Sequence, residues 1–144
     1  MKSITVTAPA TVANLACGYD LLGLAVDSPV DTISINQTDT GDIRIVSIEC
    51  GDGDLPFETH LNTAGIALTS FMEGSGIQSG LDVSIAKGIP LSGGMGSSAA
   101  SAVGAVFAAE QMFGSGQGMT ELLSHVLKAE MAVSGAAHAD NAGP

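Results

Sequence analysis

Polar and apolar residues alternate along much of the first ninety positions, which is the period-two pattern of strands with one buried face. A segment containing Gly41 separates the second and third of these runs, which predicts that they pair as a β-hairpin. The stretch from Pro9 to Gly23 is rich in turn-forming residues and predicts a connection. The runs expected to be strands are residues 3–7, 32–37, 43–49 and 81–86.

Three later segments carry helical signals. Asn62 is placed to cap a helix that runs to about Glu73 and is stopped by glycines. Residues 97–112 are rich in alanine and apolar on almost all sides, which predicts a buried helix. Thr120 is placed to cap a last helix that ends at Gly135. This order of elements favours an α+β domain with helices on one face of a mostly antiparallel sheet.

Length, charge and cysteine content narrow the class of protein. The 144 residues suffice for one domain, and four Lys and Arg against 15 Asp and Glu give a net charge of −11. That balance argues against a nucleic-acid partner and against binding to an anionic membrane surface. The uncharged interval 88–109 contains Pro90 and several glycines, so a membrane-spanning helix is a poor fit. Cys17 and Cys50 lack a redox or metal-binding spacing, so we expect reduced thiols and a cytoplasmic protein.

A glycine-rich loop lies between the last predicted strand and the predicted buried helix. Glycines let the backbone approach a ligand closely, and the helix start offers unpaired N–H groups, so the segment predicts a phosphate site. It lacks the Gly-Lys-Ser/Thr of a Walker A loop, so amides and a metal would have to neutralise the phosphate charge. A glycine-rich turn before a core helix is the alternative. The segment reads Pro90-Leu91-Ser92-Gly93-Gly94-Met95-Gly96-Ser97-Ser98-Ala99-Ala100.

Glu130 interrupts the apolar face of the last predicted helix. At about 100° per residue, Leu123 and Leu127 fall near Glu130, whereas His125 falls on the opposite side and is expected at the surface. A buried carboxylate must be protonated, paired or bound to a metal. It is either a Mg²⁺ ligand facing the phosphates, or a side chain paired in the core or extended to solvent.

A polar cluster, His138-Ala139-Asp140-Asn141, follows this helix in an otherwise apolar neighbourhood. Its donors and acceptors suit the wall of a substrate pocket. An Asx turn that ends the helix explains the same residues equally well.

Three ordered motifs resemble those of the GHMP kinase superfamily and, within it, of the homoserine kinase family. Residues 9–23 (PATVANLACGYDLLG) look like the first motif, and residues 134–141 (SGAAHADN) look like the loop after the metal-binding helix. The glycine loop looks like P-x-x-x-G-L-G-S-S-A-A, with Met95 where Leu is usual. Mevalonate and galactose kinases tend to carry Lys where this chain has Thr11 and Asp where it has Asn141. Both departures favour the homoserine kinase branch and remove an obvious general base.

The resemblance implies transfer of the ATP γ-phosphoryl group to the hydroxyl of L-homoserine, a step of threonine biosynthesis. Residues 90–100 would hold the triphosphate, and Ser98 and Glu130 would hold Mg²⁺. Asn62 would approach the adenine, and Asn141 would lie beside the reacting hydroxyl, so Glu130 and Asn141 are the expected catalytic residues. The residues expected to contact the amino-acid substrate are Asn14, Asp20, His138 and, with less direct support, Asp140, which could instead orient His138.

Members of this family are about twice as long as this chain. The resemblance therefore implies that residues 1–144 are an amino-terminal ATP-binding domain, with a ferredoxin-like second domain absent from the sequence. The absent part would carry the arginines that bind the substrate carboxylate, so the fragment alone is expected to be inactive. A homodimer is a further expectation for the full-length form. The alternatives are another small-molecule kinase of the superfamily, of mevalonate or sugar type, and a non-catalytic nucleotide-binding or dimerising module.

Overall fold

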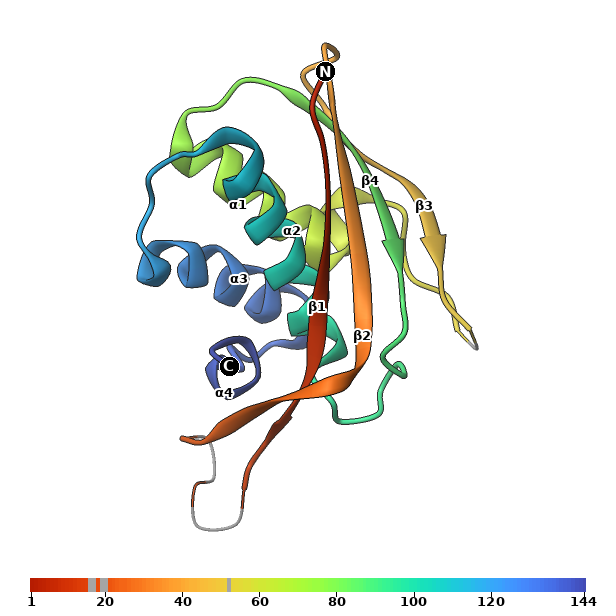
Figure 1. Ribbon diagram of the computed structural model, residues 1–144, viewed down its shortest axis with the longest axis vertical. Coiled ribbons are helices and arrows are strands. Elements are labelled where there is room, and N and C mark those ends of the chain that lie inside the picture. Colours follow the sequence, from red (N-terminus) through yellow and green to blue (C-terminus); the bar gives the residue numbers. More distant parts are fainter. Residues whose placement is uncertain (16–17, 19–20, 52) are drawn as a thin grey trace.

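A computed structural model describes residues 1–15, 18, 21–51 and 53–144 (Figure 1). The strands are β1 (Ser3–Ala13), β2 (Gly23–Thr38), β3 (Ile43–Glu49) and β4 (Gly80–Ala86). The helices are α1 (Thr63–Ser75), α2 (Ser97–Phe113), α3 (Met119–Ser134) and the single turn α4 (Ala139–Ala142), and a 3₁₀ turn at Thr59–Leu61 precedes α1.

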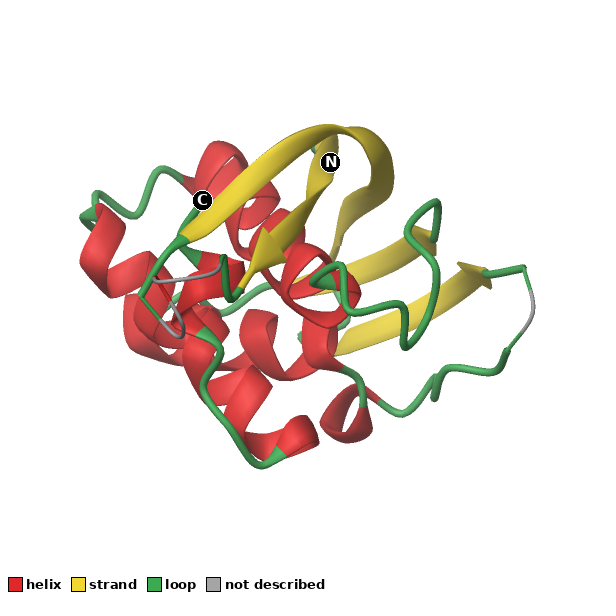
Figure 2. Cartoon of the chain, turned by 90° about the horizontal axis from the view of Figure 1, so that it is seen from below, coloured by secondary structure: helices red, strands yellow, loops and turns green. Residues whose placement is uncertain are grey.

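Within the described residues the strands form one four-stranded sheet in the order β1-β2-β4-β3. β2 is antiparallel to both β1 and β4, whereas β3 runs parallel to β4. The helices gather on one side of this sheet (Figures 1 and 2). The predicted α+β class, with a mostly antiparallel sheet and helices on one face, is confirmed.

The predicted hairpin between residues 32–37 and 43–49 is wrong. Both segments are strands, but β4 lies between them and pairs with each. Burial explains the outcome, because Leu81, Val83 and Ile85 of β4 are at most 2% exposed. β3 buries its apolar residues less completely and takes the edge, where one side of a strand is left unpaired.

The first strand is longer than its alternating pattern predicts. β1 continues through Pro9 to Ala13, so the expected connection between Pro9 and Gly23 is partly strand. The pairing register with β2 shifts between Pro9 and Thr11, which is where an edge strand tolerates proline. At the other end of the connection, a Cβ on Gly23 would lie 1.8 Å from the Asp140 carbonyl oxygen, so only glycine lets β2 pack this close to α4.

The sequence patterns predicted the helices more accurately than they predicted which strands pair. Asn62 caps α1, its Oδ1 accepting from the Ala64 amide at 3.0 Å, and α2 covers the predicted buried segment. α3 ends at Gly135 as predicted, but the predicted cap at Thr120 is wrong. The cap is Gly118 and the helix begins at Met119, two residues earlier than a cap at Thr120 implies, because the Glu121 carboxylate accepts from the Gly118 amide at 2.8 Å and fixes the first turn there.

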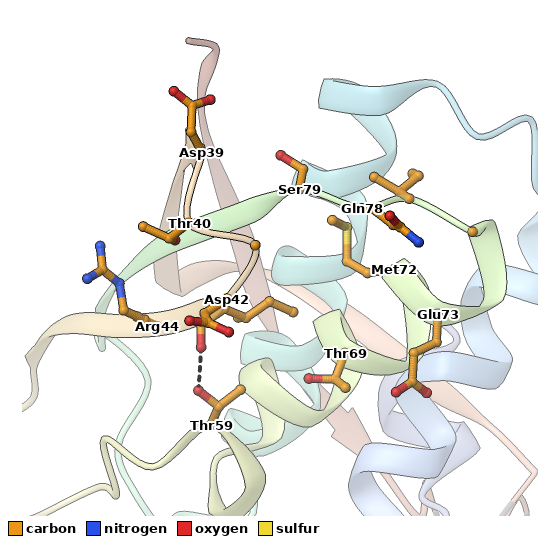
Figure 3. Close-up of a pocket in the computed structure, with 14 residues that line it drawn as sticks. Asp39, Thr40, Asp42, Arg44, Thr59, Thr69, Met72, Glu73, Gln78 and Ser79 are labelled. Carbon is orange, nitrogen blue, oxygen red and sulfur yellow. Dashed lines mark hydrogen bonds between the residues drawn. The ribbon is translucent and has the colours of Figure 1, made fainter.

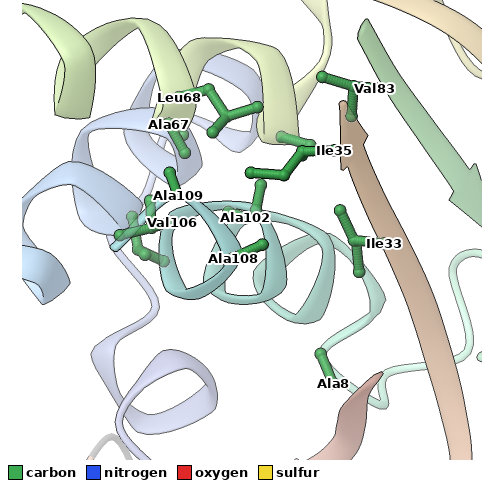
Figure 4. Close-up of a cluster of buried hydrophobic side chains, with 14 of the residues drawn as sticks. Ala8, Ile33, Ile35, Ala67, Leu68, Val83, Ala102, Val106, Ala108 and Ala109 are labelled. Atoms are coloured by element: carbon green, nitrogen blue, oxygen red, sulfur yellow. The ribbon is translucent and has the colours of Figure 1, made fainter. Parts of the chain in front are cut away.

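The core lies between the sheet and α2, with α1 and α3 packed around that helix (Figure 4). Small residues let α2 approach the sheet closely. A Cβ on Gly104 would lie 2.6 Å from Ile33 Cδ1, and Ala102, Ala105 and Ala108 are completely buried. None of the helices in the described ranges is long and apolar enough to cross a membrane.

Candidate functional site

The glycine-rich loop leaves β4 and enters α2 through a series of left-handed residues. Ser92, Gly94 and Gly96 have φ values of 57°, 67° and 65°. A Cβ on Gly96 would lie 2.2 Å from Thr11 Oγ1, so this position requires glycine for space as well as for its backbone. The Thr11 amide donates to the Met95 carbonyl at 3.1 Å and ties the loop to β1.

Ser98 and Glu130 meet at the start of α2. Glu130 is 3% exposed, which rules out the alternative that its side chain extends to solvent, and Ser98 Oγ donates to its Oε1 at 2.5 Å. The pair brings a hydroxyl and a carboxylate together beside the first turn of a helix, where unpaired amides and the positive end of the dipole favour anions. A metal-binding role for the pair remains a prediction.

A pocket of about 300 Å³ opens between the glycine loop and the start of α1. Its polar wall includes Asp54, Lys87 and the serines Ser92, Ser97, Ser98 and Ser101, and its apolar wall includes Leu55, Pro56, Leu61, Leu91 and Val133. This mixture of apolar surface with a few polar groups is typical of sites for small ligands.

Asn62 also lines this pocket, but its side chain is engaged in the fold. Besides capping α1, it donates from Nδ2 to the Pro56 carbonyl at 3.0 Å, and it is 5% exposed. Asn62 therefore holds the segment around Pro56 against α1. The predicted approach to an adenine stays a prediction, with one Nδ2 proton left to make it.

Thr11 and Asn141, which are far apart in the sequence, lie in contact. Thr11 Oγ1 donates to Asn141 Oδ1 at 3.0 Å, and both atoms border Gly96. The structure thus brings Asn141 to the glycine loop. Thr11 and Asn141, the two positions at which the resemblance favours the homoserine kinase branch, are thus hydrogen-bonded to each other.

The predicted substrate-binding residues are described in part. Asn14 is exposed, at the end of β1, with a φ of 59°, and His138 is exposed directly before α4. Asp140 Oδ2 is buried without a hydrogen-bond partner among the described residues, an arrangement that costs free energy unless a donor reaches it. Asp20 lies outside the described residues. Residues 138–141 start a helical turn, with the Ala142 amide donating to the His138 carbonyl at 3.1 Å.

Two residues near the loop were missed by the sequence analysis. Asp31 of β2 is completely buried, and it pairs with Lys87, which follows β4. Burial lowers the pKa of Lys87, and the hydrogen bond that its ammonium donates to Asp31 opposes that change. The Lys87 ammonium also donates to the Ser97 carbonyl at 2.7 Å, so this pair lies directly behind the loop.

The expectation that His125 lies at the surface is wrong. His125 is 5% exposed and bonds through its two ring nitrogens to Ser70 Oγ and Gln117 Oε1, each at 2.8 Å. Its ring also meets Phe71 edge to face. Burial, and secondarily the charge of Lys128, lower the pKa of His125 below its ordinary value.

A larger hollow of about 1120 Å³ lies elsewhere, between the turn before β3 and the outer side of α1 (Figure 3). Asp39, Asp42 and Glu73 give its lining an acidic character, and Thr59 Oγ1 donates to the Ile43 carbonyl at 2.8 Å beneath it. Its lining residues include none of the predicted site residues. The smaller pocket, in contrast, is lined by Asn62 and by Leu91, Ser92, Ser97 and Ser98 of the predicted phosphate loop.

Residues 62–143 match the family described as GHMP kinases N terminal domain. The chain belongs to the GHMP kinase family. A homoserine kinase of Xylella fastidiosa strain M12 is 43% identical over 95% of this GHMP kinase chain and 42% of its own length. A homoserine kinase of Chloroherpeton thalassium is 40% identical over the whole chain and 48% of its own length. This chain therefore spans about half the length of the curated relatives it matches.

Solved structures agree with the fold of this GHMP kinase domain. The crystal structure of a homoserine kinase from Cytophaga hutchinsonii matches with a TM-score of 0.95 and 42% identity, over all of this chain and 46% of that one. A mevalonate kinase of Methanococcus jannaschii matches with a TM-score of 0.69 at 19% identity, over 94% of this chain and 48% of that one. The second likeness concerns the fold alone.

Proposed function

We propose that residues 1–144 are the ATP-binding domain of a homoserine kinase, which transfers the γ-phosphoryl group of ATP to the hydroxyl of L-homoserine. The observation that carries the proposal is the 2.5 Å hydrogen bond between Ser98 and the buried Glu130, beside the glycine loop. Identity of about 40% to homoserine kinases along the whole chain supports the choice of substrate.

The nucleotide phosphates would lie on the amides of residues 91–98. α2, a helix of 17 residues, contributes the amides of its N-terminus. The left-handed residues of the loop would bring the loop backbone close to the ligand. The base would enter the apolar part of the 300 Å³ pocket, against Leu61, Leu91 and Val133. Such positioning supplies much of what phosphoryl transfer requires, because the step depends on alignment and charge stabilisation.

Ser98 and Glu130 fit Mg²⁺ in their chemistry, since hydroxyl and carboxylate oxygens are the hard ligands this ion prefers. In the described part of the chain no cluster of three or more His, Cys, Asp or Glu side chains could hold a metal. The remaining ligands would therefore be phosphate oxygens and water. When bound, the ion would neutralise charge on the phosphates.

Asn141 would act as a hydrogen-bond donor at the reacting end of the site. Its Oδ1 accepts from Thr11, so the Nδ2 protons are directed to other acceptors, such as an oxygen of the substrate or of the transferred group. An amide cannot remove the hydroxyl proton. We therefore propose that the proton leaves late, to a phosphate oxygen or to water.

The substrate amino acid would lie beside α4 and the end of β1. Asp140 Oδ2, which has no hydrogen-bond partner within the described residues, would accept a hydrogen bond from the substrate, and Asn14, Asp20 and His138 would complete the contact. Aspartate and histidine side chains suit an ammonium and a carboxylate, the two charged groups of an amino acid.

The test is a substrate panel on the natural full-length protein with ATP and Mg²⁺. Formation of O-phosphohomoserine, followed by ³¹P NMR, is the expected result, with mevalonate and galactose giving rates at background. ATP binding without turnover of any of these alcohols would refute the kinase assignment. Turnover of mevalonate in preference to homoserine would refute the substrate assignment alone.

A further inference from the structure

Asp31 and Lys87 form a buried ion pair behind the glycine loop. The last antiparallel partners recorded between β2 and β4 are Thr32 and Ala86, so the next positions, 31 and 87, face each other across the two strands. The side chains of Asp31 and Lys87 are 0% and 3% exposed. A buried ion pair seldom stabilises a fold more than apolar residues of similar size would, so stability alone is a poor explanation for it.

The Lys87 ammonium is fully used within the protein. Its Nζ donates to Asp31 Oδ2, to the Ser97 carbonyl at 2.7 Å and to Ser101 Oγ at 2.7 Å. Three acceptors match the three protons of an ammonium group. Although Lys87 lines the nucleotide pocket, a phosphate would therefore have to displace one of these partners to bind it.

These contacts hold both ends of the glycine loop. Asp31 Oδ1 accepts from the amides of Gly88 and Ile89, each at 3.0 Å, just before the loop begins. Lys87 holds the Ser97 carbonyl just after the loop ends, and Ser97 Oγ donates to the Ile89 carbonyl at 3.3 Å. A loop with three glycines has many accessible conformations. Fixing its ends before the nucleotide binds therefore reduces the conformational entropy that the loop loses on binding.

The pairing also suits the electrostatics of the loop. A cation beside the first turn of α2 lies at the positive end of the helix dipole, which is unfavourable by itself. Asp31 compensates that charge. The amides at the start of α2 therefore keep their attraction for an anion.

We propose that Asp31 and Lys87 are positioning residues that preorganise the glycine loop for the nucleotide phosphates without touching the nucleotide. The proposal rests on the proposed function, because it takes the loop to be the phosphate site. It predicts that loss of the Asp31–Lys87 pair weakens nucleotide binding because the loop becomes more mobile, and not because a charge contact with the nucleotide is lost.

The test replaces both residues together, as D31N/K87M, because a single replacement would leave a buried charge uncompensated. The matched control is R44M/D82N, which removes the exposed Arg44–Asp82 pair, 2.8 Å long, between β3 and β4. ADP with Mg²⁺ is titrated calorimetrically into the full-length protein at low and high ionic strength. Hydrogen exchange of amides 88–98 is followed in parallel.

For D31N/K87M we expect about tenfold weaker ADP binding at both ionic strengths and faster exchange at residues 88–98, with the control unchanged. Unchanged binding and exchange would overturn the proposal. A loss that shrinks at high ionic strength would also overturn it, because screening weakens a direct contact between lysine and phosphate.

Ser101→Ala provides a second variant should the double variant fail to fold. It removes one acceptor of Lys87, and we expect about threefold weaker ADP binding with faster loop exchange. Wild-type protein that does not bind ADP would refute the proposed function. The exchange comparison would still decide the anchoring role, since faster loop exchange supports it and unchanged exchange contradicts it.

Discussion

Replacing Glu130 by glutamine separates the charge of this carboxylate from its place in the fold. Glutamine has the same length and keeps an oxygen that accepts from Ser98 Oγ. The hydrogen bond weakens from a charge-assisted value of about 2 kcal/mol to a neutral value of about 1 kcal/mol. A loss of about 1 kcal/mol lowers the Tm of a domain of this size by about 3 °C. The fold of Glu130→Gln should therefore survive.

Activity should respond far more strongly than stability. Without the negative charge, the Ser98–Glu130 pair becomes a poor ligand for a divalent cation. We expect turnover to fall by at least about 100-fold, and the Mg²⁺ concentration for half-maximal rate to rise by about tenfold. The assay measures ADP release by the full-length protein with ATP and homoserine while Mg²⁺ is varied.

The matched control is Glu73→Gln, on the exposed side of α1 and outside the 300 Å³ pocket proposed to bind the nucleotide. It should leave both kinetic parameters at their wild-type values. Wild-type turnover at limiting Mg²⁺ by Glu130→Gln would refute the reasoning. Glu130 would then be a core carboxylate whose only role is its hydrogen bond to Ser98.

Variants at three further positions test the fold and the reacting end of the proposed site. Asn62→Ala removes the cap of α1 and the hydrogen bond to the Pro56 carbonyl, so we expect the free energy of unfolding to fall by about 2 kcal/mol and the Tm to fall by about 6 °C. Asn62→Asp keeps the cap and should recover about half of that stability. Equal melting curves for the wild type and Asn62→Ala would contradict this assignment. Asn141→Asp should leave the rate of phosphoryl transfer within about tenfold of wild type, and an increase by orders of magnitude would show that a side-chain base had been missing. The pKa of His125 lies below its ordinary 6.5, so the unfolded chain binds more protons there and stability is lost as pH falls below that value. Thermal unfolding between about pH 7.5 and 5.5 should therefore depend on pH less steeply in His125→Gln than in wild type, and equal slopes would contradict the assignment.

Local signals predicted the elements, whereas the arrangement of the strands depended on competition between distant segments. Alternation identified each strand, and the cap at Asn62 and the stop at Gly135 identified helix ends, because these patterns involve neighbouring residues. The pairing of β2 with β4 instead of β3 depends on which strand buries more apolar surface in the finished sheet. A short loop between β2 and β3 gave the misleading appearance of a hairpin.

The glycine loop and Glu130 were visible in the sequence because each breaks a local rule. Three glycines precede a core helix, and a carboxylate stands on an apolar helix face. The contact between Thr11 and Asn141 had no such signal, since 130 positions separate the two residues. The motif resemblance gave Asn141 a role in the site and Thr11 only a place in the first motif, and the folded chain brought the two together.

The Asp31–Lys87 pair did leave a signal, of the same kind as the one that exposed Glu130. Asp31 continues the inward stripe of Ile33 and Ile35 in steps of two, and Lys87 continues the stripe of Val83 and Ile85. A charge that extends a buried stripe must find a partner, and two such charges of opposite sign on two strands are candidates for each other. The hairpin expectation had assigned β2 the wrong neighbour, so the two stripes were not aligned. Because β4 is the true neighbour of β2, the register between them places Asp31 opposite Lys87. The pairing of these two strands thus connects the fold to the organisation of the proposed site.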